Sequence, residues 1–335
     1  MLARAGSIHH PSGQVIRTPL LVPSFSSKGF RVTQAGKAPE LLELFCWGAE
    51  FLTDSCLLSA FDMYYGLCPR PEDMPLNLNL TIIDSGGYEI SDNQDLSSVY
   101  SAPVRAQDWD RDKLREVLDR WPADRDSVFV SFDHPVERYT FDEQVEHAAK
   151  FANSYRHQLH ALLLKPETKE QSTLREVLKH AVADPESLAR FHIVGVTEKE
   201  LGTTTFERMK RIATLRQALD NAKITTPIHV FGSLDPISVQ LYYVSGAEIF
   251  DGLTWLRYGY HDNICVYRYD CGLIKYGLNT HDNHLRSHIM SDNINYLTEL
   301  TEDLRVFAHR RDFARFGRHE EFIRRASEQL EAHLS

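Results

Sequence analysis

Short apolar runs alternate with amphipathic stretches along most of the chain. The apolar runs are nearly continuous, which is typical of strands that are buried on both faces. Eight of them are predicted to be strands: Pro19–Pro23, Glu50–Thr53, Thr81–Asp84, Val128–Asp133, Ala161–Lys165, Phe191–Val196, Ile228–Gly232 and Glu248–Asp251.

Each gap between these strands carries apolar positions three and four residues apart, the spacing of a surface helix. The predicted helices are Ala35–Trp47, Cys56–Tyr65, Asp108–Trp121, Phe141–Leu159, Glu170–Val182, Thr204–Ala222 and Pro236–Ser245. Alternating strands and helices predict parallel strands, and eight such units predict a closed α/β barrel, the (β/α)8 or TIM barrel. A doubly wound open sheet fits the same alternation and stays the alternative.

The pattern changes after the eighth strand. Residues 252–290 are rich in Tyr, His, Asn and Asp and are expected to form an irregular insertion. Two helices, Asn293–Phe316 and Glu320–Leu334, are predicted to follow it. The expected organisation is therefore a barrel core with a catalytic rim over residues 1–251, and an insertion with C-terminal helices packed on the barrel over residues 252–335.

Composition and charge narrow the class of protein. The 335 residues are 42% hydrophobic and 25% charged, which suits a large folded core. The net charge of -10 argues against broad non-specific nucleic-acid binding but leaves room for a local basic patch. Five loosely spaced cysteines are typical of reduced intracellular thiols, and no leader or membrane-spanning stretch is evident, so a cytoplasmic protein is expected.

Candidate chemistry gathers at the ends of the predicted strands. The stretch TIIDSGGYE places Asp84 where a strand opens into a Gly-Gly turn. Asp133 ends the fourth strand and Asp251 the eighth, and Asp54 follows the second. In a (β/α)8 barrel these ends form one mouth, where the chemistry takes place. Some of these residues could instead cap the following helices, which is the favoured explanation for Asp54 but not for Asp84, Asp133 and Asp251 together.

Carboxylates that converge on one mouth are costly unless they bind a cation, share protons or meet a ligand that donates hydrogen bonds. Three chemistries fit them. Two carboxylates could hydrolyse a glycoside, several could hold a divalent metal, or one Asp could attack an anomeric carbon and form a covalent glycosyl intermediate.

Six motifs, in order along the chain, resemble those of the tRNA-guanine transglycosylase family. They are GQVIRTPLLVPSF, TIIDSGGYE, VSFDHP, FHIVGV, IHVFGSLDP and GAEIFDGLTWLR. The family exchanges guanine for a 7-deazaguanine on an insertion-bearing (β/α)8 barrel. Taken together the six are fairly specific, although Val196 replaces a family Gly and Phe231 stands where the family usually has Met.

The resemblance implies a role for each matching residue. Asp251 would be the nucleophile at C1′ of the target nucleoside, and Asp84 the general acid and base. Asp133 would accept hydrogen bonds from the base. The remaining residues of the expected base-binding site are Ser85, Tyr88, Lys165, Gly195, Phe231 and Gly232. Tyr88 and Phe231 would cover the two faces of the base, as stacking holds a base taken out of its nucleic acid.

Two departures from the family pattern change what is expected. Lys165 stands where the family has a Gln, so it would pair with Asp133 or meet an acceptor on the incoming base, unless it is a solvated rim lysine. The family's zinc-binding Cys cluster is missing, because Cys265 and Cys271 stand apart. A rearranged site with His281, His284 and His288 is conceivable, but no metal or other cofactor is expected.

Loss of the zinc-bearing part implies a different grip on nucleic acid. The candidates are Arg257, from the last motif, and the C-terminal arginines Arg310, Arg311 and Arg315, which could track phosphates. A solvated amphipathic helix pair explains the C-terminal arginines equally well.

The leading interpretation is a zinc-less pentosyltransferase that replaces guanine in a nucleic acid with a 7-deazaguanine base. DNA is a candidate partner because the family has a DNA-acting branch, and it is slightly favoured over tRNA because the zinc-bearing part is missing. The alternatives are a non-catalytic nucleic-acid-binding subunit of such an enzyme, and a glycosidase that releases the base to water. Each of these interpretations is compatible with a homodimer or with a partner subunit.

Overall fold

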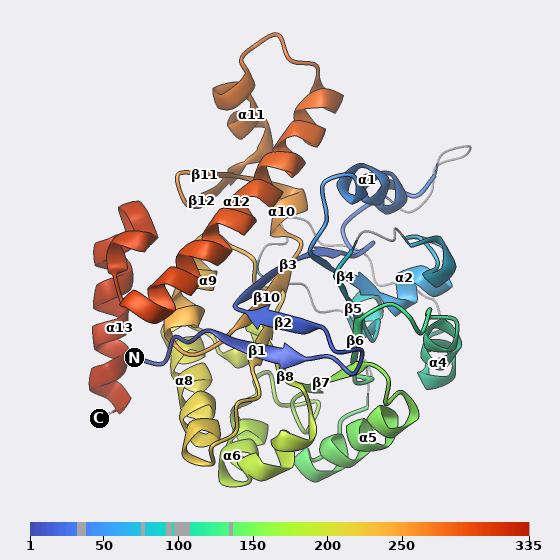
Figure 1. The fold of residues 1–335 in the computed structure, drawn as a ribbon, viewed down its shortest axis with the longest axis vertical. Helices are drawn as coiled ribbons and strands as arrows, with labels where there is room; N and C mark the ends of the chain where they lie inside the picture. Colours follow the sequence, from blue (N-terminus) through green and yellow to red (C-terminus); the bar gives the residue numbers. More distant parts are fainter. Residues whose placement is uncertain (32–37, 75–77, 92–95, 97–107, 134–136, 335) are drawn as a thin grey trace.

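The structure is a computed structural model of the chain, and it describes residues 1–31, 38–74, 78–91, 96, 108–133 and 137–334. Within these residues, eight parallel strands close into a barrel in the order β10-β3-β4-β5-β6-β7-β8-β9 (Figure 1). The strands are β3 (Leu20–Phe25), β4 (Ser55–Ser59), β5 (Leu80–Asp84), β6 (Ser127–Val130), β7 (Leu159–Leu164), β8 (Ile193–Thr197), β9 (Ile228–Phe231) and β10 (Ile249–Gly252). The predicted (β/α)8 barrel is therefore confirmed.

The barrel closes where the last strand pairs with the first. β10 pairs with β3 in a register that places Asp251 beside Val22, and the other edge of β10 pairs with β9. Strand interiors carry Val, Ile and Leu that pack inside the barrel or against the helices, since each strand is buried on both faces. The carboxyl ends of all eight strands thus meet at one mouth.

The second strand was predicted wrongly. The structure has β4 at Ser55–Ser59, a segment predicted to be helix, and not at Glu50–Thr53. A short apolar run does not distinguish a buried strand from a buried helix, and here pairing with β5 along five residues decides for the strand. Asp54 precedes β4, and its carbonyl accepts hydrogen bonds from Asn79 N and Leu80 N at 3.0 Å each, so it lies at the end of the barrel opposite the mouth.

Helices connect the strands around the outside of the barrel. They are α1 (Glu40–Ala49), α2 (Ala60–Tyr64), α3 (Gly87–Ile90), α4 (Arg111–Asp119), α5 (Phe141–Ser154), α6 (Arg175–Ala183), α7 (Glu198–Leu201), α8 (Thr205–Asn221) and α9 (Pro236–Val244), with 3-10 turns at Pro71–Asp73 and Pro185–Arg190. Capping boxes start α5 at Thr140 and α8 at Thr204, close to the predicted starts. The predicted start of the first helix lies outside the described residues.

A hairpin covers the end of the barrel opposite the mouth. It consists of β1 (Gly6–His9) and β2 (Val15–Thr18), which pair antiparallel and lie across the barrel in Figure 1. Ile8 and Ile16 are buried and join the side chains that fill the barrel interior. The hairpin therefore closes this end, and any opening to the interior must be at the mouth.

The segment after β10 is largely regular, which corrects the expected irregular insertion. It contains α10 (Thr254–Arg257), the antiparallel pair β11 (Tyr258–His261) and β12 (Ile264–Tyr267), α11 (Arg268–Tyr276), and α12 (Asp282–Arg310), which begins eleven residues before its predicted start. A 3-10 segment (Phe313–His319) and α13 (Glu320–Leu334) follow.

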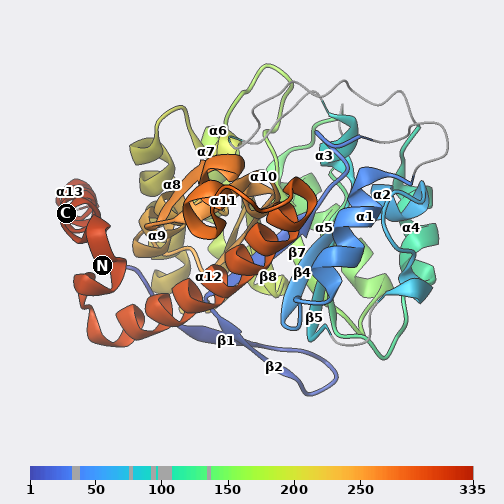
Figure 2. The same cartoon turned by 90° about the horizontal axis from the view of Figure 1, so that it is seen from above.

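One buried side chain ties this segment together. Asn293, in the middle of α12, accepts from Tyr260 N at 2.8 Å and donates to the carbonyls of Trp255 and Tyr258 at 2.7 and 2.8 Å. From there α12 runs across the barrel toward the hairpin β1–β2, as both views show (Figure 2). In the part of the chain that the structure describes, no helix has the length and apolarity needed to cross a membrane.

Candidate active site

A cavity opens at the mouth of the barrel. It encloses about 990 Å³, including its opening to solvent, and residues that follow or end the strands line it. Its described lining holds six carboxylates, Asp84, Glu89, Asp133, Glu198, Glu200 and Asp251, and three cations, Arg138, Lys165 and Lys199. The three aspartates predicted from separate strands therefore face one space.

Asp251 is held rigidly on β10. Its Oδ2 accepts a hydrogen bond from Ser24 Oγ at 2.7 Å, and its Oδ1 accepts from His229 Nε2 at 2.9 Å and Gly232 N at 3.3 Å. The side chain is 6% exposed, and it lines the cavity. Oδ2 has one partner among the described residues and keeps a lone pair for the cavity, so it is the oxygen better placed to react.

His229 was missed by the sequence analysis. It lies on β9 two residues before Phe231, so both side chains point to the barrel interior. A carboxylate only accepts hydrogen bonds, which means that Nε2 of His229 carries the proton given to Asp251. Its ring stacks on Phe231 with centroids 3.7 Å apart, and its buried Nδ1 has no hydrogen-bond partner among the described residues.

The Gly-Gly turn after β5 requires its glycines. Gly86 has φ 86°, and a Cβ there would lie 2.7 Å from Phe61 Cβ, so no other residue fits without strain. Gly86 N donates to Asp84 Oδ2 at 3.1 Å and fixes that side chain at the strand end. A Cβ on Gly87 would lie 2.5 Å from Asp133 Oδ1, so the absence of a side chain at Gly87 leaves room for the Asp133 carboxylate beside this turn.

Asp84 has an unusual electrostatic environment. Burial raises its pKa well above the ordinary value, and the negative charges of Asp133, Glu89 and Asp251 raise it further. The hydrogen bond from Gly86 N opposes this shift without cancelling it. A carboxyl group that keeps its proton to higher pH than usual is suited to act as a general acid.

Asp133 has partners on both oxygens. Ser85 Oγ donates a short hydrogen bond to its Oδ1, and Lys165 Nζ lies 3.8 Å from its Oδ2. Lys165 also pairs with Glu200 at 2.9 Å. Burial alone would lower the pKa of Lys165, but Glu200 and Asp133 outweigh it and the pKa lies above the ordinary value. Lys165 is thus a half-buried, charged donor within the cavity wall, with its side chain 15% exposed, rather than a solvated rim lysine.

Glu89 and Tyr88 form another part of the wall. Glu89 accepts from Ser26 Oγ at 2.5 Å and from Ser59 Oγ at 2.8 Å, and burial raises its pKa against the effect of these donors. Lys28 Nζ lies 4.3 Å from the centroid of the Tyr88 ring and donates to the Tyr88 carbonyl at 2.7 Å. The position of Tyr88 is therefore fixed by Lys28.

The other predicted base-binding residues divide into two groups. Phe231 and Gly232 line the cavity, as predicted. Ser85 and Gly195 are not among its lining residues. Ser85 is fully buried behind Asp133, and a Cβ on Gly195 would lie 2.5 Å from the Phe231 ring. Gly195 therefore makes room for Phe231, and Ser85 orients Asp133.

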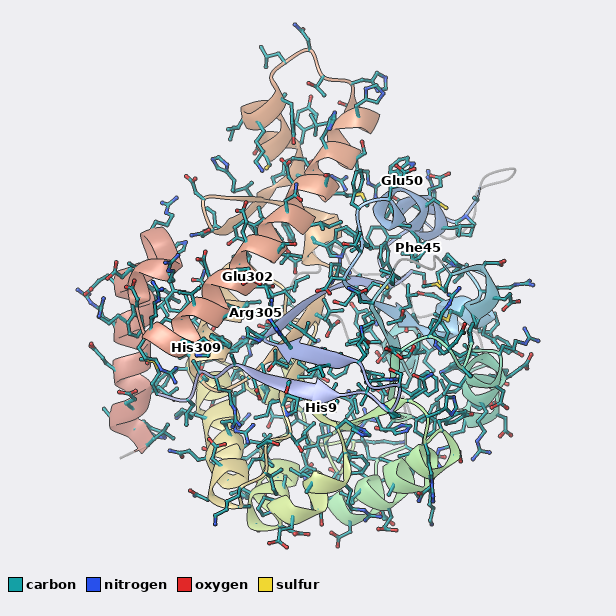
Figure 3. The ribbon with its side chains drawn as sticks, viewed as in Figure 1. His9, Phe45, Glu50, Glu302, Arg305 and His309 are labelled. Atoms are coloured by element: carbon teal, nitrogen blue, oxygen red, sulfur yellow. The ribbon has the colours of Figure 1, made fainter. Side chains whose placement is uncertain are left out.

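The predicted nucleic-acid-binding arginines do not lie together. Arg257 lies near the mouth, where its Nη2 donates to the Lys28 carbonyl at 3.3 Å. Arg305, which Figure 3 shows on the C-terminal half of α12, donates to the carbonyls of Arg17 and Pro19 just before β3. That end of α12 is therefore at the hairpin side of the barrel.

The arginines that follow Arg305 share its location. Arg311 donates to the Ala3 carbonyl at 2.7 Å, Arg315 pairs with Asp303 at 3.4 Å, and Arg310 is exposed at the end of α12. The structure does not bring Arg310, Arg311 and Arg315 to the mouth, and their predicted contact with nucleic acid stays a prediction.

The residues considered for zinc do not fit a zinc site. Cys271 packs against Leu285 and Ile289, and Cys265 faces Asp235. The side chains of His281, His284 and His288 are exposed on α12 and just before it. Across the described residues, no three His, Cys, Asp or Glu side chains gather in a way that would hold a metal ion.

Comparisons with known proteins add no further constraint. No protein-family model matches the chain, and no curated protein matches its sequence. The geometry therefore carries the functional argument: a closed (β/α)8 barrel whose mouth holds an oriented carboxylate, a carboxyl group with a raised pKa, and a cation between two further carboxylates.

Proposed function

We propose that the chain is a glycosyl-transferring enzyme that exchanges a purine-type base in a nucleic acid through a covalent intermediate on Asp251. The observation that carries this proposal is the contrast between two carboxyl groups in one cavity. Asp251 is oriented by Ser24, His229 and Gly232, whereas burial and neighbouring charges favour the protonated form of Asp84. A nucleophile beside a general acid is what base displacement needs.

The reaction has two balanced steps. Asp251 Oδ2 gives an electron pair to C1′ while the bond from C1′ to the base nitrogen breaks, and the proton of Asp84 neutralises the departing base. The incoming base then gives its ring N–H proton to Asp84, its nitrogen bonds to C1′, and Asp251 leaves as a carboxylate. An anion below the sugar stabilises the oxocarbenium-like transition states, and two displacements retain the anomeric configuration.

Asp133 and Lys165 supply complementary recognition of the base. Asp133 accepts hydrogen bonds, and a guanine-type ring offers two adjacent N–H donors on one edge. Lys165 is a donor on the same wall, 3.8 Å from Asp133. A guanine-type base has N–H donors that can meet Asp133 and a neighbouring acceptor that can meet Lys165. This match supports guanine as the leaving base and a 7-deazaguanine with a polar substituent as the incoming base.

The nucleic acid in this proposal is DNA or tRNA, with DNA favoured. The experiment that tests the function is incorporation of labelled guanine or a labelled 7-deazaguanine into guanine-containing DNA, with tRNA in a parallel reaction. The expected result is label in one polymer, lost in Asp251→Asn and strongly reduced in Asp84→Asn. Release of guanine without incorporation would instead identify a base-releasing glycosidase, and binding without either would identify a non-catalytic subunit.

A further inference from the structure

A second cavity adjoins the mouth, outside the site described so far. It encloses about 910 Å³, including its opening, and lies against α4, α5 and the ends of β6 and β7. Asp133, Arg138, Leu163 and Lys165 line both cavities. These four side chains therefore form a wall that the mouth and the second cavity share.

The second cavity differs in charge from the mouth and from the chain as a whole. Its described lining carries five cations, Arg111, Arg115, Arg138, Lys150 and Lys165, and two carboxylates, Asp133 and Glu137. The whole chain has a net charge of -10. A cationic concavity in an acidic protein favours an anionic ligand, because low-dielectric walls concentrate the field there.

Aromatic rings lie among these cations. The guanidinium carbon of Arg111 is 5.7 Å from the ring centroids of both Phe132 and Tyr139. Tyr139 packs edge-on to His147, with centroids 4.7 Å apart, and burial followed by Arg111 lowers the pKa of His147. The rings and the guanidinium plane form surfaces on which a base can stack, whereas Arg115 and Lys150 at the rim are exposed and can meet phosphate.

We propose that the second cavity binds the nucleotide next to the target in the same strand, with its phosphate against Arg115 and Lys150 and its base against the aromatic rings. This inference rests on the proposed function, since it assumes that the nucleoside in the mouth belongs to a polynucleotide. It assigns the grip on nucleic acid to α4 and α5 instead of the C-terminal arginines. A target nucleotide in the mouth and its neighbour in the second cavity would be separated by the shared wall.

The test compares two double variants with equal loss of charge. Arg115→Ala with Lys150→Ala removes the rim cations of the second cavity. Arg120→Ala with Arg325→Ala is the control. Arg120 matches Arg115 because it lies at the end of the same helix, is 56% exposed where Arg115 is 60% exposed, and likewise pairs with a nearby acid. Binding of single-stranded guanine-containing trinucleotides is measured against salt, and incorporation of labelled base is measured in parallel.

The expected result is trinucleotide binding weakened on the order of tenfold in the cavity variant, with a salt slope smaller by about 0.7 for each phosphate that the variant no longer neutralises, and no change in the control. Binding of free guanine should be unchanged. If the wild type and the cavity variant bind the trinucleotide equally well and labelled base is still incorporated, the second cavity is overturned as a subsite and the proposed function is upheld. Cavity-dependent binding without incorporation would overturn the function and uphold the subsite. Guanosine monophosphate binding as tightly as the trinucleotide, with the same weakening in the variant, would show a free-nucleotide site and overturn the assignment to a neighbouring nucleotide.

Discussion

The two ends of the barrel both bury charge, but they do so differently. At the hairpin end Arg216 is fully buried, its Nη1 lies 3.5 Å from Glu248, and it donates to the carbonyls of Thr226 and Ile224 at 2.9 and 2.7 Å. At the mouth Asp84, Glu89 and Asp133 lie near one another, and burial together with the charges of Asp133 and Glu89 raises the pKa of Asp84.

This difference predicts that the buried charges at the hairpin end contribute to stability, whereas those at the mouth contribute to the reaction. Removing one partner of a buried ion pair leaves a less compensated buried charge, which costs stability. Carboxylates gathered around a cavity are instead relieved when a ligand or a proton arrives. Substitutions at the hairpin end should therefore change stability, and those at the mouth should change activity.

Among substitutions that leave the nucleophile Asp251 in place, the largest expected effect at the mouth comes from Asp84→Asn. Loss of the general acid should lower the rate of base exchange by about 10² to 10⁴-fold. The melting temperature should stay the same or rise, because a buried group repelled by its neighbours is removed. Asp54→Asn is the matched control, since Asp54 lies beside the neighbouring strand at the opposite end, and it should leave the rate unchanged. A normal rate in Asp84→Asn would remove Asp84 from the reaction.

At the hairpin end, Arg216→Met should destabilise the fold by about 3 kcal/mol, because Glu248 keeps only Arg4 of its two cations and the buried carbonyls of Thr226 and Ile224 lose their donor. Urea unfolding measures this change in stability. Base exchange per folded molecule should not change. The reverse outcome, a stable variant with impaired exchange, would contradict the division between the two ends.

Buried acids at both ends of the barrel should make the fold less stable as the pH rises. Burial raises the pKa of Glu248 to about 7, despite Arg4 and Arg216, and burial also raises that of Asp84. A raised pKa in the folded state gives stability that is full below the ordinary pKa and lost as the pH rises through the raised one. For Glu248 the loss between pH 4.5 and 8 should be on the order of 2 to 3 kcal/mol. Unfolding of Glu248→Gln across this range should show a flatter curve, and an unchanged slope would exclude Glu248 as its source.

A smaller effect is expected from His229, which acts on the reaction through Asp251. His229→Leu removes the donor to Asp251 Oδ1 and should lower the rate of exchange by roughly 10 to 100-fold with little change in base affinity. His229→Gln can place an amide N–H near the same position and should recover part of the rate. Equal loss in both variants, or loss of base binding alone, would argue for a packing role beside Phe231.

Local patterns were sufficient to predict the barrel and the three aspartates. Asp84 ends β5, Asp251 is the last residue but one of β10, and Asp133 follows β6 closely, so the topology alone brings them together. His229 could not be recognised in the same way, because its partner Asp251 comes from the neighbouring strand 22 residues later. A polar residue on the interior face of an otherwise apolar strand was the available signal.

Other features depended on contacts that a local pattern does not contain. Glu198 and Glu200 follow β8 in α7, a helix of four residues that lies outside the predicted helix Thr204–Ala222 and was not predicted. β4 was assigned as helix because its apolar run is ambiguous without its neighbour β5. The hairpin β11–β12 is held by Asn293 from α12, a contact 33 residues away along the chain.

The most direct test of the proposed chemistry is the location of the covalent intermediate. The protein is mixed with guanine-containing DNA or tRNA, quenched by denaturation and digested, and the peptides are analysed by mass spectrometry. The expected result is a nucleotide-bearing peptide in which Asp251 carries the sugar, absent from Asp251→Asn and present when incoming base is withheld. An adduct on another residue, or base exchange that persists in Asp251→Asn, would contradict the assignment of Asp251 as the nucleophile.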